Sequence, residues 1–185
     1  LLLVALPLSV LSCTPAASAR ITVVDDAWRA VYIEETPQRE VSLAPSITET
    51  LFALDLGDRV VAVTEHCDYP AEAQEKAKVG GYFATSLESI LDNDPDLILT
   101  DGHDPVGEQL LKLDIPVLIL QPKDIFGIFR DITLLGKVMN REQEAARLVS
   151  SLQERLDRVA QMTAGVTSRP TVFYEIDATD PTKPW

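Results

Sequence analysis

Short runs of almost wholly apolar residues recur along this sequence and are separated by stretches with helical periodicity. The runs are Val60–Thr64, Leu97–Thr100 and Val117–Leu120, and a more polar one precedes them at Glu40–Ala44. Strands that are apolar at consecutive positions are typical of a parallel sheet covered on both faces. The regular alternation of such strands with helices therefore predicts an open α/β domain.

Capping and breaking residues set the expected bounds of the helices. Pro45 ends the first of these strands, and Ser46 and Glu49 have capping-box spacing ahead of a helix through Leu54. A hairpin is expected over residues 21–33, with Asp25-Asp26 as its turn. The other predicted helices are a short one after Pro70, one over 87–91 capped by Ser86, one over 106–113, and one from Asp124 to Met139.

A longer helix is predicted over Arg141–Met162, with an apolar face that begins at Ala145 and ends at Val159. At about 1.5 Å per residue it is about 33 Å long, enough to act as a strut across a domain. The run Thr171–Ile176 then reads as a strand, and a strand needs partners. It either returns to the first sheet or begins a second domain, and the second alternative is preferred. We expect an N-terminal lobe over 20–140, an interlobe helix over 141–162, and the first strand of a second lobe over 170–185.

The first residues have the character of a targeting segment. Leu1–Leu11 is nearly all apolar but shorter than the roughly 18 residues needed to span a bilayer, so it reads as part of a signal peptide. Two cleavage sites compete. Val10-Leu11-Ser12-Cys13 resembles a lipobox in which Cys13 is acylated, and Ala17-Ser18-Ala19 resembles an ordinary signal peptidase site. Residues 1–19 are therefore expected to be a leader and tether.

Charge and cysteine content narrow the range of partners. The net charge is −13, from 29 acidic and 16 basic residues, which disfavours binding to nucleic acid. Partners should be neutral, cationic or basic. Cys13 and Cys67 lie in settings too different for a disulfide to be the natural interpretation, and Cys67 is expected to be a small buried hydrophobe.

Several segments, taken in order, carry a family likeness. Arg39–Glu49, Cys67–Pro70, Ser86–Glu88 and Asp94–Ile98 resemble the N-terminal lobe of the periplasmic cobalamin- and siderophore-binding proteins of ABC importers, and Val172–Pro184 resembles the start of their second lobe. The resemblance implies a Rossmann-like first lobe, a rigid helical connection, and a ligand held between two lobes. It also implies a monomer outside the cytoplasm, either a lipoprotein anchored through Cys13 or a soluble periplasmic protein.

Ligands of open α/β sheets sit beyond the carboxyl ends of the strands. The loops expected there supply the candidate ligand-binding residues, which are Pro45, Ser46, His66, Tyr82, Asp101 and His103. By the resemblance, His66, Tyr82 and Asp101 occupy places where aromatic side chains line a corrin site, and only Tyr82 keeps an aromatic ring. His66 can ligate or face a corrinoid cobalt, because neutral imidazole is a common metal ligand.

The resemblance favours capture of a corrinoid and its delivery to an ABC permease, with a ferric siderophore or haem as the alternative ligand. It also implies that Glu88, in the first turn of a helix, docks onto the permease. The plainer interpretation is that the Glu88 carboxylate only stabilises the N-terminus of its own helix. A metal-dependent hydrolase using Glu65, His66, Asp101 and His103 is a further alternative, as is a purely structural lipoprotein. The sequence contains no HExxH, GxSxG or Walker-type motif, so no catalytic residue, cofactor or resident metal is expected.

Overall fold

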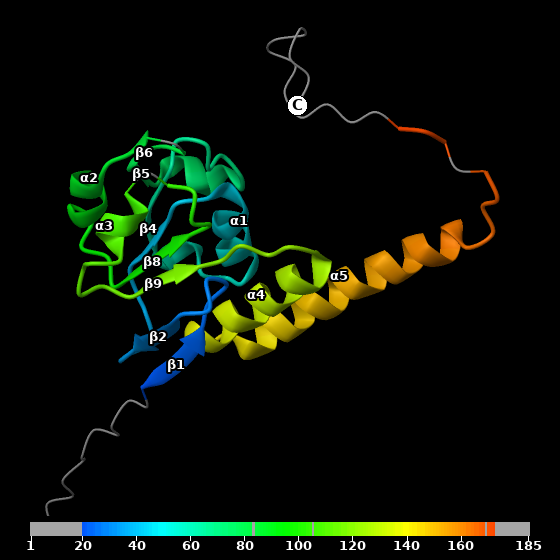
Figure 1. Cartoon of the computed structure of the whole chain (residues 1–185), viewed down its shortest axis with the longest axis horizontal. Helices are drawn as coiled ribbons and strands as arrows, with labels where there is room; N and C mark the ends of the chain where they lie inside the picture. The colour runs from blue at the N-terminus through cyan, green and yellow to red at the C-terminus, as the bar shows by residue number, and fades with distance from the viewer. Residues whose placement is uncertain (1–19, 83, 105, 169, 173–185) are drawn as a thin grey trace, which may run out of the picture. The chain divides into compact units, whose positions relative to one another are not determined.

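A computed structural model describes residues 20–82, 84–104, 106–168 and 170–172 (Figure 1). Its centre is a parallel sheet of five strands in the order β5-β4-β3-β8-β9. The strands are β3 (Glu40–Ser42), β4 (Val60–Val63), β5 (Ala77–Lys78), β8 (Leu97–Thr100) and β9 (Val117–Ile119). The open parallel α/β fold predicted from the alternating apolar runs is confirmed.

The core forms around the middle strands of this sheet. All four residues of β8 are buried, and a cluster that includes Val41, Ala62, Ile98 and Leu110 fills the interior. Burying apolar side chains on both faces of a strand is the main favourable contribution to folding such a sheet. The helices that cover it are α1 (Pro45–Ala53), α2 (Leu87–Leu91), α3 (Gly107–Leu110) and α4 (Ile125–Val138), with 3₁₀ turns η1 (Gly57–Arg59) and η2 (Ala71–Glu75).

Two of the expected helix bounds are wrong. Ala44 is the N-cap of α1 and Pro45 is its first residue, with no side-chain capping bond, so Ser46 does not cap the helix. Proline suits this first position because its fixed φ is helical and its missing N–H has no partner there anyway. The helix expected over 106–113 is confined to α3, because the chain turns after Leu111. The caps at Ser86 and Asp124 are confirmed, since each side chain accepts a bond from an amide three residues later.

The expected hairpin is formed by β1 (Ile21–Val24) and β2 (Ala30–Ile33). The aspartates of its turn also contact β9 and α4. The Asp25 carboxylate accepts bonds from the Arg29 guanidinium and, at 3.3 Å, from the Ile119 amide of β9. Asp26 accepts a bond of 2.7 Å from the Gln121 amide and also binds Arg130 of α4. The two carboxylates thereby fasten the hairpin to the sheet edge and to α4.

A tight reversal joins α4 to the long helix α5 (Glu142–Thr163), which begins one residue later than expected. A Cβ on Gly136 would lie 2.4 Å from the Cβ of Ala145, so only glycine allows the two helices to approach this closely. Asn140 takes the left-handed conformation, φ 55°, that often ends a helix. The chain divides into two compact units after Val149, within α5.

Several predictions about the two ends of the chain concern residues that the structure does not describe. Cys13 and the rest of residues 1–19 are not among the described residues. Of the strand expected over Thr171–Ile176, the described residues Thr171 and Val172 are not in a strand, and the others lie outside the described residues. Within the described part of the chain, no helix is long and apolar enough to cross a membrane.

Candidate ligand-binding site

The loops at the carboxyl edge of the sheet carry most of the candidate ligand-binding residues. α1 begins directly after β3, Glu65 and His66 follow β4, and Asp101 follows β8. The carboxyl ends of parallel strands share one edge, so these loops meet there. A small antiparallel hairpin, β6 (Gly80–Gly81) and β7 (Ala84–Thr85), lies beyond β5 and carries Tyr82 at its turn.

Tyr82, Asp101 and His103 form one chain of contacts at this edge. The Tyr82 hydroxyl donates a hydrogen bond to Asp101 Oδ2. Asp101 Oδ1 accepts a 3.1 Å bond from the His103 amide and lies 3.5 Å from His103 Nδ1. Burial, the hydrogen bond to Asp101 and the nearby negative charges raise the pKa of Tyr82 to about 12. The phenol therefore remains a hydrogen-bond donor at neutral pH, and its ring has a fixed anchor.

A buried set of polar contacts around Asp104 supports the arrangement of Tyr82, Asp101 and His103. Asp104 is buried and accepts bonds of 2.5 Å from Thr100 Oγ1 and 3.4 Å from Thr85 Oγ1. Thr100 Oγ1 in turn accepts a 2.9 Å bond from the amide of Gly102, whose φ of +80° suits glycine. Because Thr85 belongs to β7 and Thr100 to β8, Asp104 joins the Tyr82 hairpin to the loop that carries Asp101.

His66 lies close to the same hairpin. The Glu65 amide donates a 2.9 Å bond to the carbonyl of Gly80, which brings the loop after β4 against β6. A Cβ placed on Gly81 would be 4.0 Å from His66 Cε1 and 3.8 Å from a Glu65 carboxylate oxygen. His66 itself is exposed. Its imidazole is therefore available at the rim, next to the residue that precedes Tyr82.

Pro45 and Ser46 occupy the start of α1, where Pro45 is half-buried and Ser46 is exposed. The first turn of α1 is tied to the loop after β4, because Thr48 Oγ1 lies 3.2 Å from the sulfur of the buried Cys67. The expected burial of Cys67 is confirmed. The structure thus brings Tyr82, Asp101 and His103 together, sets His66 nearby, and gives Pro45 and Ser46 no part in that chain of contacts.

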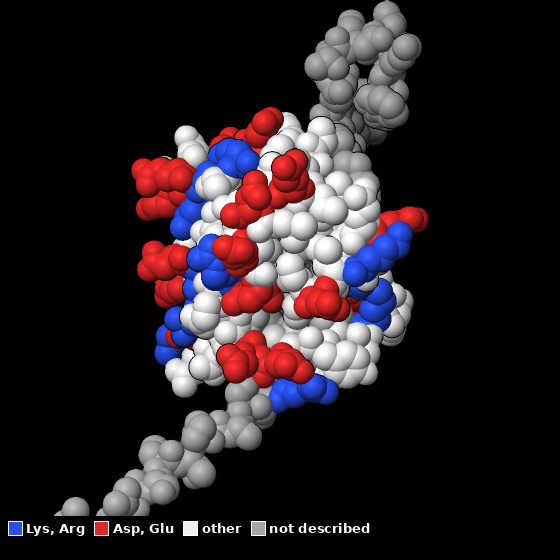
Figure 2. Space-filling view, turned by 90° about the vertical axis from the view of Figure 1, so that its left-hand side faces the viewer, with Lys and Arg blue, Asp and Glu red and all other residues white. Residues whose placement is uncertain are grey.

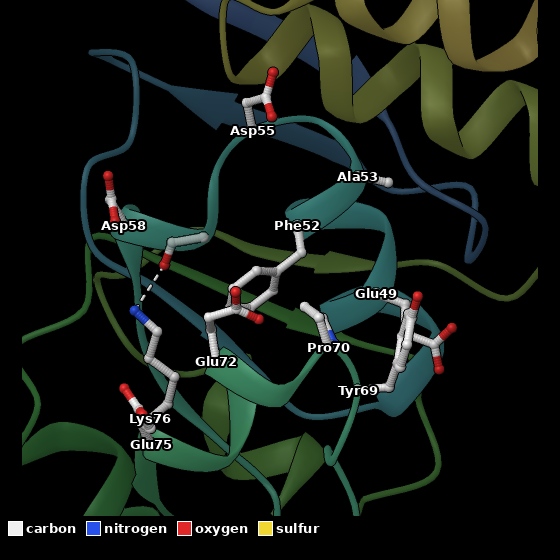
Figure 3. A pocket seen from close by; sticks show the side chains of 11 residues that line it. Glu49, Phe52, Ala53, Asp55, Asp58, Tyr69, Pro70, Glu72, Glu75 and Lys76 are labelled. Carbon is white, nitrogen blue, oxygen red and sulfur yellow. Dashed lines mark hydrogen bonds between the residues drawn. The ribbon is translucent and has the colours of Figure 1, made fainter.

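A groove of about 790 Å³ opens on the outer side of α1, between η1 and η2 (Figure 3). Sequence reasoning missed it, and none of the candidate ligand-binding residues lines it. Lys76 donates a 2.7 Å bond to the Gly57 carbonyl, which is drawn as the dashed line in Figure 3, and its Nζ lies 5.9 Å from the centre of the Phe52 ring. The residues that line the groove are Glu49, Phe52, Ala53, Asp55, Gly57, Asp58, Tyr69, Pro70, Glu72, Glu75 and Lys76.

The sequence signal that could have indicated this groove is the three-residue spacing of acidic and aromatic residues in the segments that form α1 and η2. Glu49 and Phe52 are three residues apart on α1, and so are Glu72 and Glu75 in η2. Within the described residues, the acidic side chains of the groove accept no hydrogen bond, whereas Asp101 and Asp104 at the carboxyl edge do.

Acidic residues also mark the molecular surface. Figure 2 shows Asp and Glu side chains spread over the face that lies at the left of Figure 1, where Lys and Arg gather mainly toward the margins. Glu88 is exposed in the first turn of α2, whose N-terminus is capped by Ser86. Within the described residues, no group of three or more His, Cys, Asp or Glu side chains is arranged to hold a metal ion.

A parallel α/β fold with polar loops at the carboxyl edge of its sheet is typical of domains that bind small ligands at that edge. The chain belongs to the family described as periplasmic binding protein, which matches residues 41–180. This is a family of extracytoplasmic solute-binding proteins, and the resemblance inferred from the sequence is confirmed.

Two curated relatives illustrate the likeness. The ABC transporter substrate-binding lipoprotein YvrC of Bacillus subtilis (strain 168) is 31% identical over 164 residues, covering 84% of this chain and 52% of the relative. A vitamin B12-binding protein of Pectobacterium carotovorum (strain PC1) is 33% identical over 133 residues, covering 70% of this chain and 48% of the relative. The chain thus spans about half the length of these relatives.

Solved structures agree with this fold. The vitamin B12-binding protein BtuF of Vibrio cholerae is 30% identical, with a TM-score of 0.64, and the match covers 70% of this chain and 52% of that one. A haem-binding protein of Pseudomonas aeruginosa is 27% identical, with a TM-score of 0.64, over 69% of this chain and 47% of that one. The siderophore-binding protein BauB has a TM-score of 0.73 at 22% identity, over 82% and 57%, which shows the shared fold alone.

Proposed function

We propose that this protein captures a corrinoid between two lobes and delivers it to an ABC transporter permease. The observation that carries the proposal is the Tyr82 ring, held at the carboxyl edge of the sheet by Asp101. An aromatic face fixed in place is a suitable platform for a large flat macrocycle. The exposed imidazole of His66, beside the same hairpin, supplies a group that can face the corrinoid cobalt.

The names of the relatives support the same ligand class without choosing among its members. Vitamin B12-binding proteins occur both among the curated relatives and among the solved structures. A ferric siderophore or haem is the second candidate, since proteins that bind these ligands share the fold. The hydrolase alternative finds no support, because the family is one of solute-binding proteins.

Calorimetric titration of the full-length protein with cyanocobalamin, haemin and several ferric siderophores tests the proposal. We expect saturable binding of cyanocobalamin that weakens at least about tenfold in Tyr82→Ala, since a lost aromatic contact of about 1.4 kcal/mol corresponds to that factor. Tyr32→Ala is the matched control, because Tyr32 is exposed on β2 and lies outside the segments that form the carboxyl edge. Binding of haemin or a siderophore alone would replace the corrinoid, and binding of none of them would refute the proposal.

Delivery is proposed to depend on Glu88. Its carboxylate is exposed at the start of α2 and available to pair with basic side chains of a permease. Glu88→Arg should leave cyanocobalamin affinity unchanged and weaken binding to the reconstituted permease at least about tenfold, more at low salt than at high salt. Glu108→Arg is the matched control, an exposed acid in the first turn of α3. Equal permease binding by both variants would show that Glu88 serves only its own helix.

Anchoring is proposed to occur through Cys13, with the mature protein acting as a monomer outside the cytoplasm. One of the curated relatives is a lipoprotein, which supports this arrangement. Cys13→Ala in the full-length protein should abolish retention in the membrane fraction, whereas Ser12→Ala should not. A mature N-terminus at Arg20 would instead indicate cleavage after Ala19 and a soluble periplasmic protein.

A further inference from the structure

The carboxyl edge of the sheet is acidic. The described segments that form it are residues 43–46, 64–70, 79–82, 84–86, 101–104, 106 and 120–124, and together they contain one basic residue, Lys123. The acidic residues of the same segments are Glu65, Asp68, Asp101, Asp104 and Asp124. A ligand approaching this edge therefore meets a negative potential.

Asp101 is the acid placed closest to the expected platform. Its side chain is 20% exposed, one oxygen binds the Tyr82 hydroxyl, and the other faces His103. In the described residues, the charged contacts of Asp101 come from His103 and not from a lysine or arginine. Its negative charge is therefore not neutralised by direct contact with a permanent cation in this part of the chain.

The lysine within these segments, Lys123, and the one just before them, Lys78, are bonded to groups other than Asp101. Lys78 donates bonds of 3.2 Å and 3.1 Å to the carbonyls of Cys67 and Ala73, behind the loop that carries His66. Lys123 donates a 3.1 Å bond to the side-chain oxygen of Gln121. Neither ammonium group is bonded to Asp101, so neither offsets its charge by direct contact.

We infer that Asp101 determines the charge selectivity of the ligand site, so that this lobe accepts neutral or cationic ligands and rejects anionic chelates. The inference rests on the proposed function and narrows its ligand class. An anionic chelate would lose water beside an unneutralised carboxylate, which opposes its binding, whereas a neutral or cationic macrocycle with amide donors would not suffer this repulsion. The same side chain also positions Tyr82, so its two effects must be separated.

Three probes of different charge separate them in the full-length protein. These are neutral cyanocobalamin, cationic aquacyanocobinamide and an anionic ferric tris-catecholate, each titrated at low and at high salt. We expect the wild-type protein to bind the corrinoids at least about tenfold more tightly than the catecholate, with a difference that narrows as salt screens the carboxylate. A catecholate that binds as tightly as the cobinamide would overturn the inference.

Asp101→Asn removes the charge while retaining an oxygen that can accept the Tyr82 hydrogen bond. We expect this variant to lower the preference for the cobinamide over the catecholate at least about tenfold. Tyr82→Phe loses the hydroxyl and keeps the charge, so corrinoid affinity should fall while the preference remains. Asp58→Asn, an exposed acid of the groove beside α1, should change neither.

The outcomes distinguish the inference from the function it rests on. An Asp101→Asn variant that folds, binds corrinoid and keeps the wild-type preference would show that Asp101 does not set selectivity, and the function would stand. A wild-type protein that binds none of the three probes would instead remove the proposed function. Melting temperatures of each variant establish that a loss of binding does not reflect unfolding.

Discussion

The carboxyl edge of the sheet and the groove beside α1 are both rich in carboxylates, yet they use them differently. At the edge, Asp101 is bonded to Tyr82 and His103, and Asp104 is bonded to Thr85 and Thr100. In the groove, Glu49, Glu72 and Glu75 are exposed, and none is in a salt bridge within the described part of the chain. Acidic composition alone therefore does not identify a site.

The difference follows from where each set of carboxylates lies. The groove carboxylates stand on the outer side of a helix, where water solvates and screens them at little cost. Those at the edge come from loops after buried strands, where a polar group without a partner would cost free energy. Fixed hydrogen bonds thus accompany burial, and they also hold the ring and the charge that the proposed function uses.

The largest expected effect concerns a carboxylate in a third location, at the opposite end of the strands, which is buried and has no hydrogen-bond partner. Glu40 opens β3, is fully buried, and neither carboxylate oxygen has a hydrogen-bond partner. Burial raises its pKa from 4.5 to about 7, and Asp96 adds to the rise while Arg59 opposes it. The folded protein therefore keeps a proton on Glu40 at pH values where the unfolded chain has lost it.

The sign of the pH dependence follows. Between about pH 4.5 and pH 7 the folded state binds more protons, so the free energy of unfolding falls as the pH rises, by at most about 3 kcal/mol from Glu40. Glu40→Gln should remove that part of the slope in urea denaturation measured from pH 5 to pH 8. Asp131, whose pKa burial and Asp26 raise to about 6, contributes in both proteins and cancels in the comparison. Identical slopes would contradict the prediction.

The next effect tests the difference between the two regions directly. Asp104→Ala should lower the free energy of unfolding by about 2 kcal/mol, because the hydroxyls of Thr85 and Thr100 lose a buried acceptor. Glu75→Ala, in the groove, should change it by less than about 0.5 kcal/mol. Urea denaturation of both variants measures the contrast, and comparable losses would mean that the groove carboxylates are structurally engaged after all.

Strands β4, β8 and β9 were predictable because each is an apolar run with a clear boundary, and the more polar β3 was predictable because Pro45 marks its end. β5 was missed because Ala77 and Lys78 are both exposed at the sheet edge and carry no apolar signal. The start of α1 was misplaced because Ser46 has capping-box spacing, while the decisive feature is the preference of proline for the first helical position.

The proximity of Tyr82 and Asp101 was predictable from the sequence, whereas their hydrogen bond was not. The carboxyl-edge rule placed Tyr82 and Asp101 in the same region, although they are 19 residues apart in the chain. Their hydrogen bond depends on how the β6–β7 hairpin lies against the loop after β8, and Asp104 fixes that relation through tertiary contacts. The groove was missed for a related reason, because its lining comes from three separate segments around α1, η1 and η2.

The smallest expected effect lies within the groove, at its lysine. Lys76 donates a hydrogen bond to Gly57 and places its ammonium over Phe52, so Lys76→Met should lower the free energy of unfolding by about 0.5 kcal/mol while keeping most of the apolar stem. Lys76→Arg should restore most of that loss. Both contacts are partly open to water, which can replace the lost donor, and this is why the effect should be smaller than that of Asp104→Ala. Thermal and urea unfolding of the two lysine variants provide the measurement. A loss in Lys76→Met as large as in Asp104→Ala would show that the groove is held together as firmly as the carboxyl edge, and the distinction between a solvated surface and a preorganised one would fail.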